Sequence, residues 1–228
     1  MNMIIFVGGS KGGTGKSIVC STVLDYLSQK NMDPILVETD TSNPDVYKSH
    51  KSLISLSVTA LELDSADGWI ELINLADKSK GRPLVVNTAA RNLIGVEKYG
   101  STLINTLSEL ERELITLWTI NRQRDSLELL VDYLQALPLG DRHVLHVVRN
   151  LYFGDPGKYQ LYSDSEIKKR IESSGRTIDF PDLADRVADD LATRRLSIKS
   201  AIEELPIGNR AELLRWRIAA HRSLAEVL

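Results

Sequence analysis

Short apolar runs alternate with longer amphipathic stretches through the first two-thirds of the chain. Each apolar run is continuous, as is typical of strands buried on both faces of a parallel sheet. These runs predict strands at residues 3–8, 34–39, 83–88, 114–119 and 143–149. The stretches between them predict helices at residues 16–30, 69–77, 102–109 and 123–136. Strands that alternate with helices indicate an α/β fold with a mostly parallel sheet flanked by helices.

The pattern changes at Gly154-Asp155-Pro156-Gly157, a cluster of residues that interrupts regular structure. Beyond it the sequence becomes mainly helical, with one short strand near residues 176–178. We therefore expect a core at residues 1–154 and a mainly helical C-terminal region at residues 155–228 that packs on it.

The last predicted helix, at residues 209–228, is amphipathic. Its apolar face is formed by Leu213, Trp216, Ala220, Leu224 and Val227. A helix that lies on a membrane is typically rich in Lys and Arg on its polar face, whereas Glu212 and Glu226 dilute that charge here. We therefore expect this helix to dock on the domain or on a partner protein, and no membrane association.

The composition is that of an ordinary globular protein without a field that would attract nucleic acid. The chain has 228 residues, of which 43% are hydrophobic and 26% are charged, and its formal net charge is −3. No signal peptide is apparent, and no run approaches the roughly 20 apolar residues that span a bilayer. The single cysteine, Cys20, excludes a disulfide within the chain. We expect a cytoplasmic protein in which Cys20 serves as small buried packing.

A glycine-rich loop joins the first predicted strand to the first predicted helix. Residues 9–17 read Gly-Ser-Lys-Gly-Gly-Thr-Gly-Lys-Ser, although the general phosphate-loop pattern has glycine where this chain has Ser10. Glycines let the backbone turn several N–H groups inward around phosphate oxygens, and the following helix adds its partial positive charge. In such a loop Lys16 reaches the β- and γ-phosphates and the Ser17 hydroxyl ligates Mg²⁺. The loop predicts a nucleoside triphosphate site.

Polar side chains stand where two further predicted strands end. Glu38 and Asp40 close the strand at 34–39, and Asn87 closes the strand at 83–88. Ligands of open α/β sheets bind at this edge, which makes these side chains candidates for the site. Acids at strand ends also cap the helix that follows, and Asn43-Pro44 has the form of a helix start. Both interpretations of Glu38 and Asp40 stay open.

The segment Lys11-Gly12-Gly13-Thr14-Gly15-Lys16-Ser17 resembles the deviant Walker A motif of the ParA/MinD group of P-loop ATPases. In that family the early lysine, Lys11 here, reaches across a dimer that sandwiches the nucleotide and contacts the phosphates of the partner subunit. The resemblance implies a homodimer with ATP at its interface, and it implies Lys11, Lys16 and Asp40 as catalytic residues. A lysine in trans adds positive charge where the leaving phosphate accumulates negative charge.

The same resemblance assigns roles at the strand ends. Asp40 matches the second acid of the family's Asp-x-Asp pair, which positions magnesium and the attacking water, and Glu38 stands at the first. It implies Mg²⁺ ligands at Ser17, Asp40 and Glu38. Asn150, at the end of the strand at 143–149, matches an Asn that commonly holds adenine. It implies that nucleotide contacts Gly12, Gly13, Thr14, Gly15, Lys16, Ser17, Ile18, Arg149 and Asn150, and the missing Asn-Lys-x-Asp pattern favours ATP over GTP.

Asn87 departs from the family pattern. The family ends this strand with an Asp that holds the magnesium shell through water, and Asn brings no negative charge. Two hypotheses follow. Either Asp40 and Glu38 carry the magnesium alone and ATP hydrolysis is slow, or the protein binds nucleotide with little turnover.

Over about its first two-thirds the chain looks like the plasmid-encoded StbB/MobD/TraL group of ParA-like proteins. The similarity is carried by the segments at residues 38–45, 86–88 and 148–154. It implies a role in plasmid mobilisation, conjugal transfer or plasmid stability, with a plasmid-encoded DNA-binding or relaxosome protein as partner. Direct non-specific DNA binding stays open. Other hypotheses are an interaction protein that binds nucleotide structurally, and a metabolite kinase or ligase on a similar fold.

Overall fold

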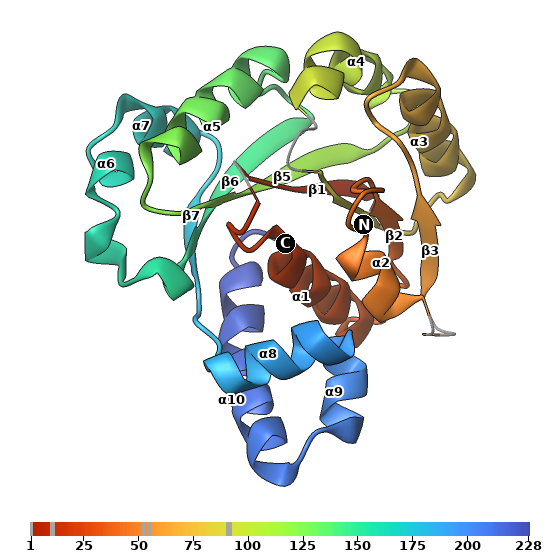
Figure 1. Cartoon of the computed structure of the whole chain (residues 1–228). Helices are drawn as coiled ribbons and strands as arrows, with labels where there is room; N and C mark the ends of the chain where they lie inside the picture. The colour runs from red at the N-terminus through yellow and green to blue at the C-terminus, as the bar shows by residue number, and fades with distance from the viewer. Residues whose placement is uncertain (1, 10–11, 52, 54–55, 90–92) are drawn as a thin grey trace.

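A parallel sheet with helices on both faces forms the centre of the molecule (Figure 1). The structure, a computed structural model, describes residues 2–9, 12–51, 53, 56–89 and 93–228. Its sheet is seven-stranded with the order β3-β2-β4-β1-β5-β6-β7, and neighbouring strands pair in parallel. The fold class expected from the sequence is confirmed.

The strands of the sheet are β1 (Met3–Gly9), β2 (Ile35–Glu38), β3 (Ser57–Ala60), β4 (Leu84–Asn87), β5 (Glu113–Ile120), β6 (His143–Asn150) and β7 (Thr177–Phe180). The helices that surround it up to residue 136 are α1 (Lys16–Gln29), α2 (Asp45–His50), α3 (Ala66–Lys78), α4 (Leu93–Thr106) and α5 (Arg124–Ala136). Those that follow β6 are α6 (Gln160–Ser163), α7 (Glu166–Glu172), α8 (Asp185–Arg194), α9 (Ile198–Glu204) and α10 (Ile207–Leu224), together with the 3₁₀ turns Leu151–Phe153 and Pro156–Lys158.

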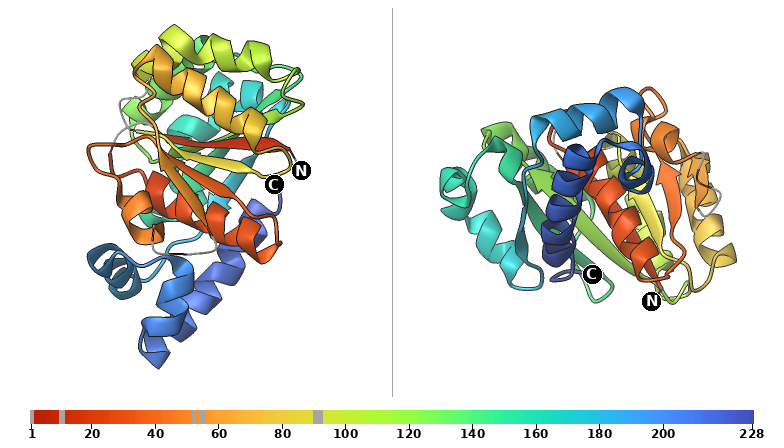
Figure 2. Two further views of the ribbon diagram at one scale, coloured as in Figure 1. Left: turned by 90° about the vertical axis from the view of Figure 1, so that its right-hand side faces the viewer. Right: turned by 90° about the horizontal axis from the view of Figure 1, so that it is seen from below.

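Each face of the sheet has its own hydrophobic core. On β1, Met3, Ile5 and Val7 belong to the core that includes α1, α8, α9 and α10, whereas Ile4 and Phe6 belong to the core with α3, α4 and α5. Successive side chains of a strand point to opposite faces, so a continuous apolar run serves both cores. Figure 2 shows the two layers of helices on either side of the sheet.

Three elements differ from the sequence-based expectations for physical reasons. The strand β3 lies in a segment expected to be irregular; its side chains are half-buried or exposed at the sheet edge, so no apolar run marks it. Helix α3 begins three residues early because the Ser65 hydroxyl accepts a hydrogen bond from the Gly68 N–H. Helix α4 begins at Leu93 and contains Gly100, where a side chain would collide with Leu137 at the close approach of α4 and α5.

The C-terminal elements complete the sheet and cover α1. Strand β7 pairs with β6 at the sheet edge. On α10 the side chains Leu213, Trp216, Ala220 and Leu224 are fully buried, and the helix packs against α1 and β7. Among the described residues, no helix has both the length and the apolarity needed to cross a membrane.

A carboxylate on α1 holds α10 in place. Asp25 accepts two hydrogen bonds from Arg217, at 2.6 and 2.9 Å, and its Oδ2 lies 2.8 Å from the His221 Nε2. Burial raises the pKa of the Asp25 carboxyl, but hydrogen bonds from His221 and Arg217 outweigh burial, so the pKa lies below its ordinary value. The ionised carboxylate therefore ties the C-terminal helix to the helix that follows the glycine-rich loop.

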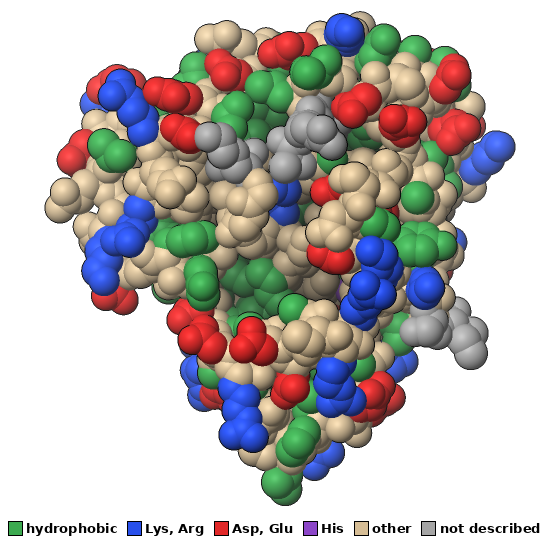
Figure 3. Space-filling model, in the orientation of Figure 1, with side chains coloured by type: hydrophobic (Ala, Val, Ile, Leu, Met, Phe, Trp, Pro, Cys, Tyr) green, Lys and Arg blue, Asp and Glu red, His purple; other side chains and the backbone are tan. Residues whose placement is uncertain are grey.

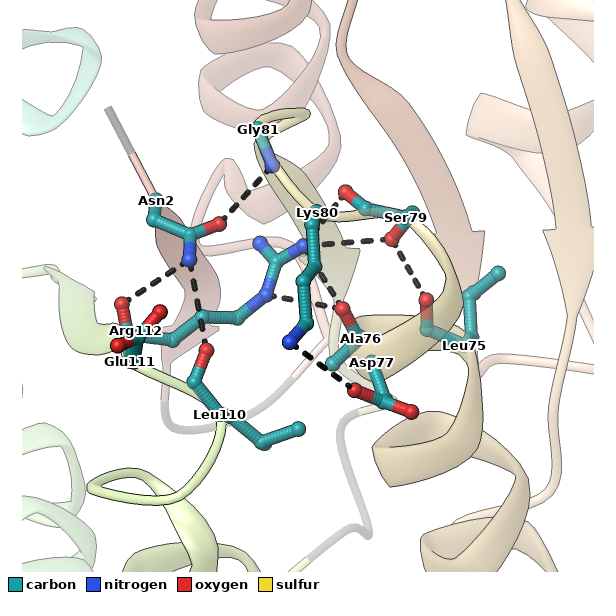
Figure 4. A network of polar contacts seen from close by, with 10 residues as sticks. All are labelled: Asn2, Leu75, Ala76, Asp77, Ser79, Lys80, Gly81, Leu110, Glu111 and Arg112. Carbon is teal, nitrogen blue, oxygen red and sulfur yellow. Dashed lines mark hydrogen bonds and ion pairs between the residues drawn. The ribbon is translucent and has the colours of Figure 1, made fainter.

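The buried guanidinium of Arg112, just before β5, joins three segments of the chain. Figure 4 shows its contacts to Ala76 and Ser79 at the end of α3. Arg112 is fully buried and donates only to oxygens in the contacts described: to Ala76 O at 2.9 and 3.1 Å, to Ser79 O at 2.7 Å, to Met3 O at 3.2 Å and to Arg82 O at 2.9 Å. The carbonyls of Ala76 and Ser79 belong to the end of α3, where a cation is favoured by the helix dipole. Its planar fork satisfies carbonyls that would otherwise be buried without donors.

We predict that Arg112→Lys lowers the free energy of unfolding by about 3 kcal/mol, because one ammonium cannot reach carbonyls on three segments. Urea unfolding at neutral pH measures the change. Arg124→Lys is the matched control, since the Arg124 side chain is 83% exposed and forms its ion pair with Glu128 at the surface; it should alter stability by less than about 0.5 kcal/mol. Equal effects of the two variants would contradict a structural role for the Arg112 fork.

We predict that Asp25→Asn lowers the free energy of unfolding by about 2 kcal/mol at neutral pH, because it leaves Arg217 without its carboxylate. A carboxyl whose folded pKa is depressed stabilises the fold above its unfolded value of about 4, and that stabilisation is lost as the pH falls through the folded pKa. The difference between wild type and variant should therefore shrink below about pH 4 in urea unfolding series. Asp77→Asn, at a side chain 62% exposed, is the control; a pH-independent difference for Asp25→Asn would refute the ion pair as its cause.

Candidate functional site

The glycine-rich loop lies at the carboxyl edge of the sheet, between β1 and α1. Gly13 and Gly15 have φ of +85° and +96°, the left-handed region that other residues adopt only with strain. Gly15 is also the N-cap of α1, and a β-carbon there would overlap the Asn150 side-chain amide. The first turn of α1 holds no acidic residue, so the helix N-terminus presents uncompensated partial positive charge. The described part of the loop has the geometry of an anion-binding cradle.

The predicted base-contacting residue Asn150 holds this loop from β6. Its Nδ2 donates to the Thr14 carbonyl at 3.0 Å, and its Oδ1 accepts from the Tyr152 N–H at 3.2 Å. Thr14 is fixed further because its hydroxyl lies 3.2 Å from that of Thr119, which donates to the Gly8 carbonyl at 2.9 Å. Asn150 therefore positions the backbone of the loop, a role that the sequence did not indicate.

Arg149 lies apart from the loop. Successive side chains of β6 point to opposite faces of the sheet, and Arg149 makes two hydrogen bonds to Asp179 on β7, at 2.7 and 3.0 Å. The structure thus brings Asn150 to the loop and pairs Arg149 with the edge strand.

Lys16 and Asp40 come together at the edge of the sheet. Lys16 is the first residue of α1 and is largely buried; burial lowers its pKa, and the negative charge of Asp40 partly restores it. The Asp40 Oδ1 accepts from the Ser42 hydroxyl at 2.6 Å and from the Asn43 N–H at 3.0 Å, which fixes the carboxylate in a turn. Ser17 follows Lys16 and is exposed. A buried cation, a fixed carboxylate and an accessible hydroxyl therefore surround the helix N-terminus.

Glu38 and Asp40, both predicted as Mg²⁺ ligands, lie in different surroundings. Its carboxylate is fully buried and accepts hydrogen bonds from the Asp40 N–H at 3.1 Å, the Asn87 Nδ2 at 2.9 Å and the Tyr47 N–H at 3.3 Å. Burial raises the pKa of Glu38, while these hydrogen bonds oppose the rise. The bond to Tyr47 satisfies a donor in the first turn of α2, so Glu38 has the capping role that the sequence left open.

Asn87 carries an unsatisfied acceptor. Its Nδ2 donates to Glu38, and its Oδ1 is buried with no hydrogen-bond partner in the described residues. The backbone is well held, because the Asn87 carbonyl accepts from the Thr39 N–H at 3.1 Å and the Thr39 hydroxyl at 2.9 Å. Buried acceptors in folded proteins nearly always have a donor, so this oxygen marks a place for one.

An apolar cavity of about 340 Å³ opens beside the loop. Figure 3 shows hydrophobic side chains within a hollow of this face of the molecule. The cavity reaches from Gly13, Gly15 and Ser17 to a wall built by side chains of α1, α2, β7, α8 and α10, among them Ile18, Val46, Phe180, Leu191 and Trp216. The sequence did not indicate this wall, because its members lie up to 198 residues apart and each has the appearance of ordinary core.

Lys11, Gly12 and Gly13 are the remaining site residues that the sequence predicted. Lys11 lies outside the described residues. Gly12 and Gly13 are exposed, and a β-carbon at Gly12 would meet no described residue within 4 Å beyond its chain neighbours. Within the described ranges no group of three or more His, Cys, Asp or Glu is placed to hold a metal ion by itself.

Thr119 was missed by sequence reasoning; a polar residue at the carboxyl end of an apolar strand was the available signal.

Known proteins resemble this chain in sequence and in fold. No protein-family model matches the chain. Protein MobD of Acidithiobacillus ferrooxidans is 51% identical over 226 residues, which cover 99% of this chain and 97% of that protein. The MinD cell division protein of Aquifex aeolicus matches in structure with a TM-score of 0.56 and 13% identity, covering 100% of this chain and 98% of that chain.

Two further structures match less closely. The Pyrococcus furiosus cell division ATPase MinD gives a TM-score of 0.50 at 14% identity, over 96% of this chain and 99% of that chain. FlhF complexed with GTP and Mg²⁺ gives 0.50 at 13% identity, over 79% of this chain and 66% of that chain. At such identities the structural likeness concerns the fold, which is the MinD-like P-loop fold that the sequence predicted.

We predict that Gly15→Ala weakens nucleotide binding at least about tenfold, because a positive φ and the Asn150 amide both oppose a methyl group. Titration with a fluorescent ATP analogue measures the change. Gly12→Ala is the control within the same loop, since no atom of the described residues beyond its chain neighbours lies within 4 Å of the added atom; its affinity should stay within about threefold of wild type. A larger loss for Gly12→Ala than for Gly15→Ala would contradict the loop geometry.

Proposed function

The chain belongs to the MobD family, and from that premise we propose that it is a Mg-ATP-dependent switch that dimerises. ATP binds at the loop between β1 and α1, two copies close over the nucleotide, a partner is engaged, and slow hydrolysis resets the complex. The observation that carries the proposal is the buried Lys16 at the N-terminus of α1 with Asp40 beside it. This arrangement provides positive charge for transferred phosphate and a fixed carboxylate next to it.

The side chains at the sheet edge fit a magnesium ion. Mg²⁺ prefers oxygen ligands and keeps several waters, and Ser17 and Asp40 offer a hydroxyl and a carboxylate. The buried Asn87 Oδ1 has no donor among the described residues, and a water of the metal shell would supply one. We assign the ion to Ser17 and Asp40, because all the described contacts of the Glu38 carboxylate are hydrogen bonds from the protein. When bound, the ion would neutralise charge on the β- and γ-phosphates.

Each remaining residue has a defined task in this proposal. The backbone N–H groups around Gly13 and Gly15 cradle phosphate oxygens, and Lys16 stabilises the charge of the transferred phosphoryl group. Asp40 orients the attacking water or the metal shell. The apolar cavity beside the loop excludes water from one side of the nucleotide. Lys11 acts in trans on the partner's phosphates, a role that rests on the resemblance of the loop to the ParA/MinD motif.

We propose that the switch acts in plasmid mobilisation, conjugal transfer or plasmid stability, and that its partner is a plasmid-encoded DNA-binding or relaxosome protein. A relaxase gene or an origin of transfer next to the gene would identify the candidate partner. Co-purification of that partner with the ATP-bound form, and not with the nucleotide-free form, would support the switch.

A second function is favoured by Asn87. A neutral side chain at a strand end where ParA-like ATPases usually have an acid agrees with a protein that binds nucleotide structurally and turns it over little. Steady-state phosphate release distinguishes the two functions. Turnover well above background that is lost in Asp40→Ala would exclude the second function, and turnover at background in the dimeric wild type would favour it.

We predict that wild type sediments as a dimer with a non-hydrolysable ATP analogue and as a monomer without it. Lys11→Ala should bind the analogue and stay monomeric, because the lysine contributes only across the interface. Lys16→Ala should lose binding, and with it dimerisation. Analytical ultracentrifugation combined with analogue titration measures both properties. A wild type that stays monomeric with saturating analogue would refute the proposal that the protein is a dimerising switch.

A further inference from the structure

A buried carboxylate–amide pair lies behind the proposed magnesium site. Glu38 and Asn87 occupy facing positions of the paired parallel strands β2 and β4, and the Asn87 Nδ2 donates to the Glu38 Oε1 at 2.9 Å. Both residues are buried, with exposed fractions of 0% and 4%. The neighbouring side chains Leu36 and Val85 belong to the core that includes α1, so the pair faces the helix that begins at Lys16.

Glu38 fixes the orientation of the Asn87 amide. An ionised carboxylate only accepts hydrogen bonds, so the Asn87 NH₂ must face Glu38 and the amide oxygen must face away. This assignment follows from chemistry and does not depend on telling nitrogen from oxygen. The result is a buried acceptor, the Asn87 Oδ1, without a donor in the described part of the chain.

Glu38 is itself fully engaged by the protein. Its Oε1 accepts from the Asp40 N–H at 3.1 Å and from Asn87, and its Oε2 accepts from the Tyr47 N–H at 3.3 Å. With both oxygens bonded and no exposed surface, the side chain lacks the open position that a direct metal ligand needs. Any effect of Glu38 on the ion must therefore pass through Asn87 or through the turn at Asp40.

The direction of the amide decides what Asn87 can bind. A water bound to a cation turns its lone pairs to the metal and its O–H bonds outward, so it needs an acceptor in the next layer. An amide with its oxygen outward is such an acceptor. An amide with its NH₂ outward presents donors to the O–H donors of the water and cannot accept from them. A neutral side chain can serve this purpose only if something holds it in one of its two orientations.

We propose that Glu38 is a positioning residue that keeps the Asn87 Oδ1 turned towards a water of the magnesium shell. This inference rests on the proposed function, since it concerns the ion that accompanies bound nucleotide. In this arrangement the position where ParA-like proteins usually carry an acid holds the neutral Asn87, and Glu38 on the neighbouring strand orients its amide. The neutral amide then acts as an oriented acceptor instead of a charged one.

The test measures how much Mg²⁺ strengthens nucleotide binding. The quantity is the affinity for a fluorescent ATP analogue with Mg²⁺ divided by its affinity in a chelator, here called the magnesium ratio. We expect Asn87→Ala to lower the ratio about tenfold, as removal of a residue behind the metal shell commonly does. Glu38→Gln should lower it several-fold, because a glutamine offers both donor and acceptor and releases the amide from its single orientation.

The combination of the two changes separates positioning from direct binding. If Glu38 acts through Asn87, Glu38→Gln has no further effect on the magnesium ratio in the Asn87→Ala background. If Glu38 contacts the ion or acts through Asp40, Glu38→Gln lowers the magnesium ratio by the same factor in the wild-type and in the Asn87→Ala background. That result would overturn the inference. Glu109→Gln makes the same chemical change at an exposed turn before β5 and should leave the ratio at its wild-type value.

An isosteric exchange provides the second arm, should either single variant be unstable. Glu38→Gln with Asn87→Asp keeps a donor facing an acceptor between the strands, and an aspartate accepts in both orientations. The magnesium ratio should return to at least the wild-type value in this double variant. A ratio as low as that of Glu38→Gln alone would overturn the inference, and melting without nucleotide confirms that each variant is folded.

The outcome for wild type keeps the two proposals apart. A wild type that binds no nucleotide, or binds it without Mg²⁺ dependence, overturns the proposed function and this inference with it. A Mg²⁺-dependent wild type with an unchanged ratio in Glu38→Gln overturns the inference alone and leaves the proposed function standing.

Discussion

The hydrogen bond from the Asn150 amide to the Thr14 carbonyl joins segments 136 residues apart, and the shape of the glycine-rich loop depends on it. The bond requires that nothing stand between β6 and the loop, and Gly15 meets that requirement because any side chain there would overlap the amide. The same glycine caps α1 in a left-handed conformation and thereby directs the helix N-terminus along the sheet edge. Sheet order, loop and helix are consistent with one another only because two residues far apart in sequence meet at this point.

Charge at the site is arranged so that each group has a defined partner. Lys16 is buried at the helix N-terminus near Asp40, and Asp40 is fixed by hydrogen bonds from the residues that follow it. Glu38, two residues earlier at the end of β2, is buried in the protein, where it caps α2 and holds the Asn87 amide. Two acids only two residues apart thus have different environments, because β2 ends at Glu38, whose side chain faces the core, whereas Asp40 lies beyond the strand in a turn at the sheet edge.

Helix α1 connects the site to the C-terminal region. Its first turn faces the loop, its apolar residues lie in the core with α10, and Asp25 near its end binds Arg217 and His221. The cavity beside the loop is closed by α8 and α10 together with the end of β7, so C-terminal side chains form one side of the space next to the proposed nucleotide. The helical region is therefore part of the surroundings of the site as well as of the core.

The sequence alone determined the local features of this protein. Continuous apolar runs marked most strands because those strands are buried on both faces, and the loop at residues 9–17 indicated phosphate binding because glycine and lysine spacing is a local property. The edge strand β3 and the true start of α4 were missed, since one has half-exposed side chains and the other holds a glycine for close packing against α5. Tertiary structure alone decided that Asn150 supports the loop, that Glu38 faces inward and that the Asn87 Oδ1 lacks a hydrogen-bond partner among the described residues. Those roles depend on which strands lie side by side and on which groups meet across them, and no single stretch of the chain contains both partners.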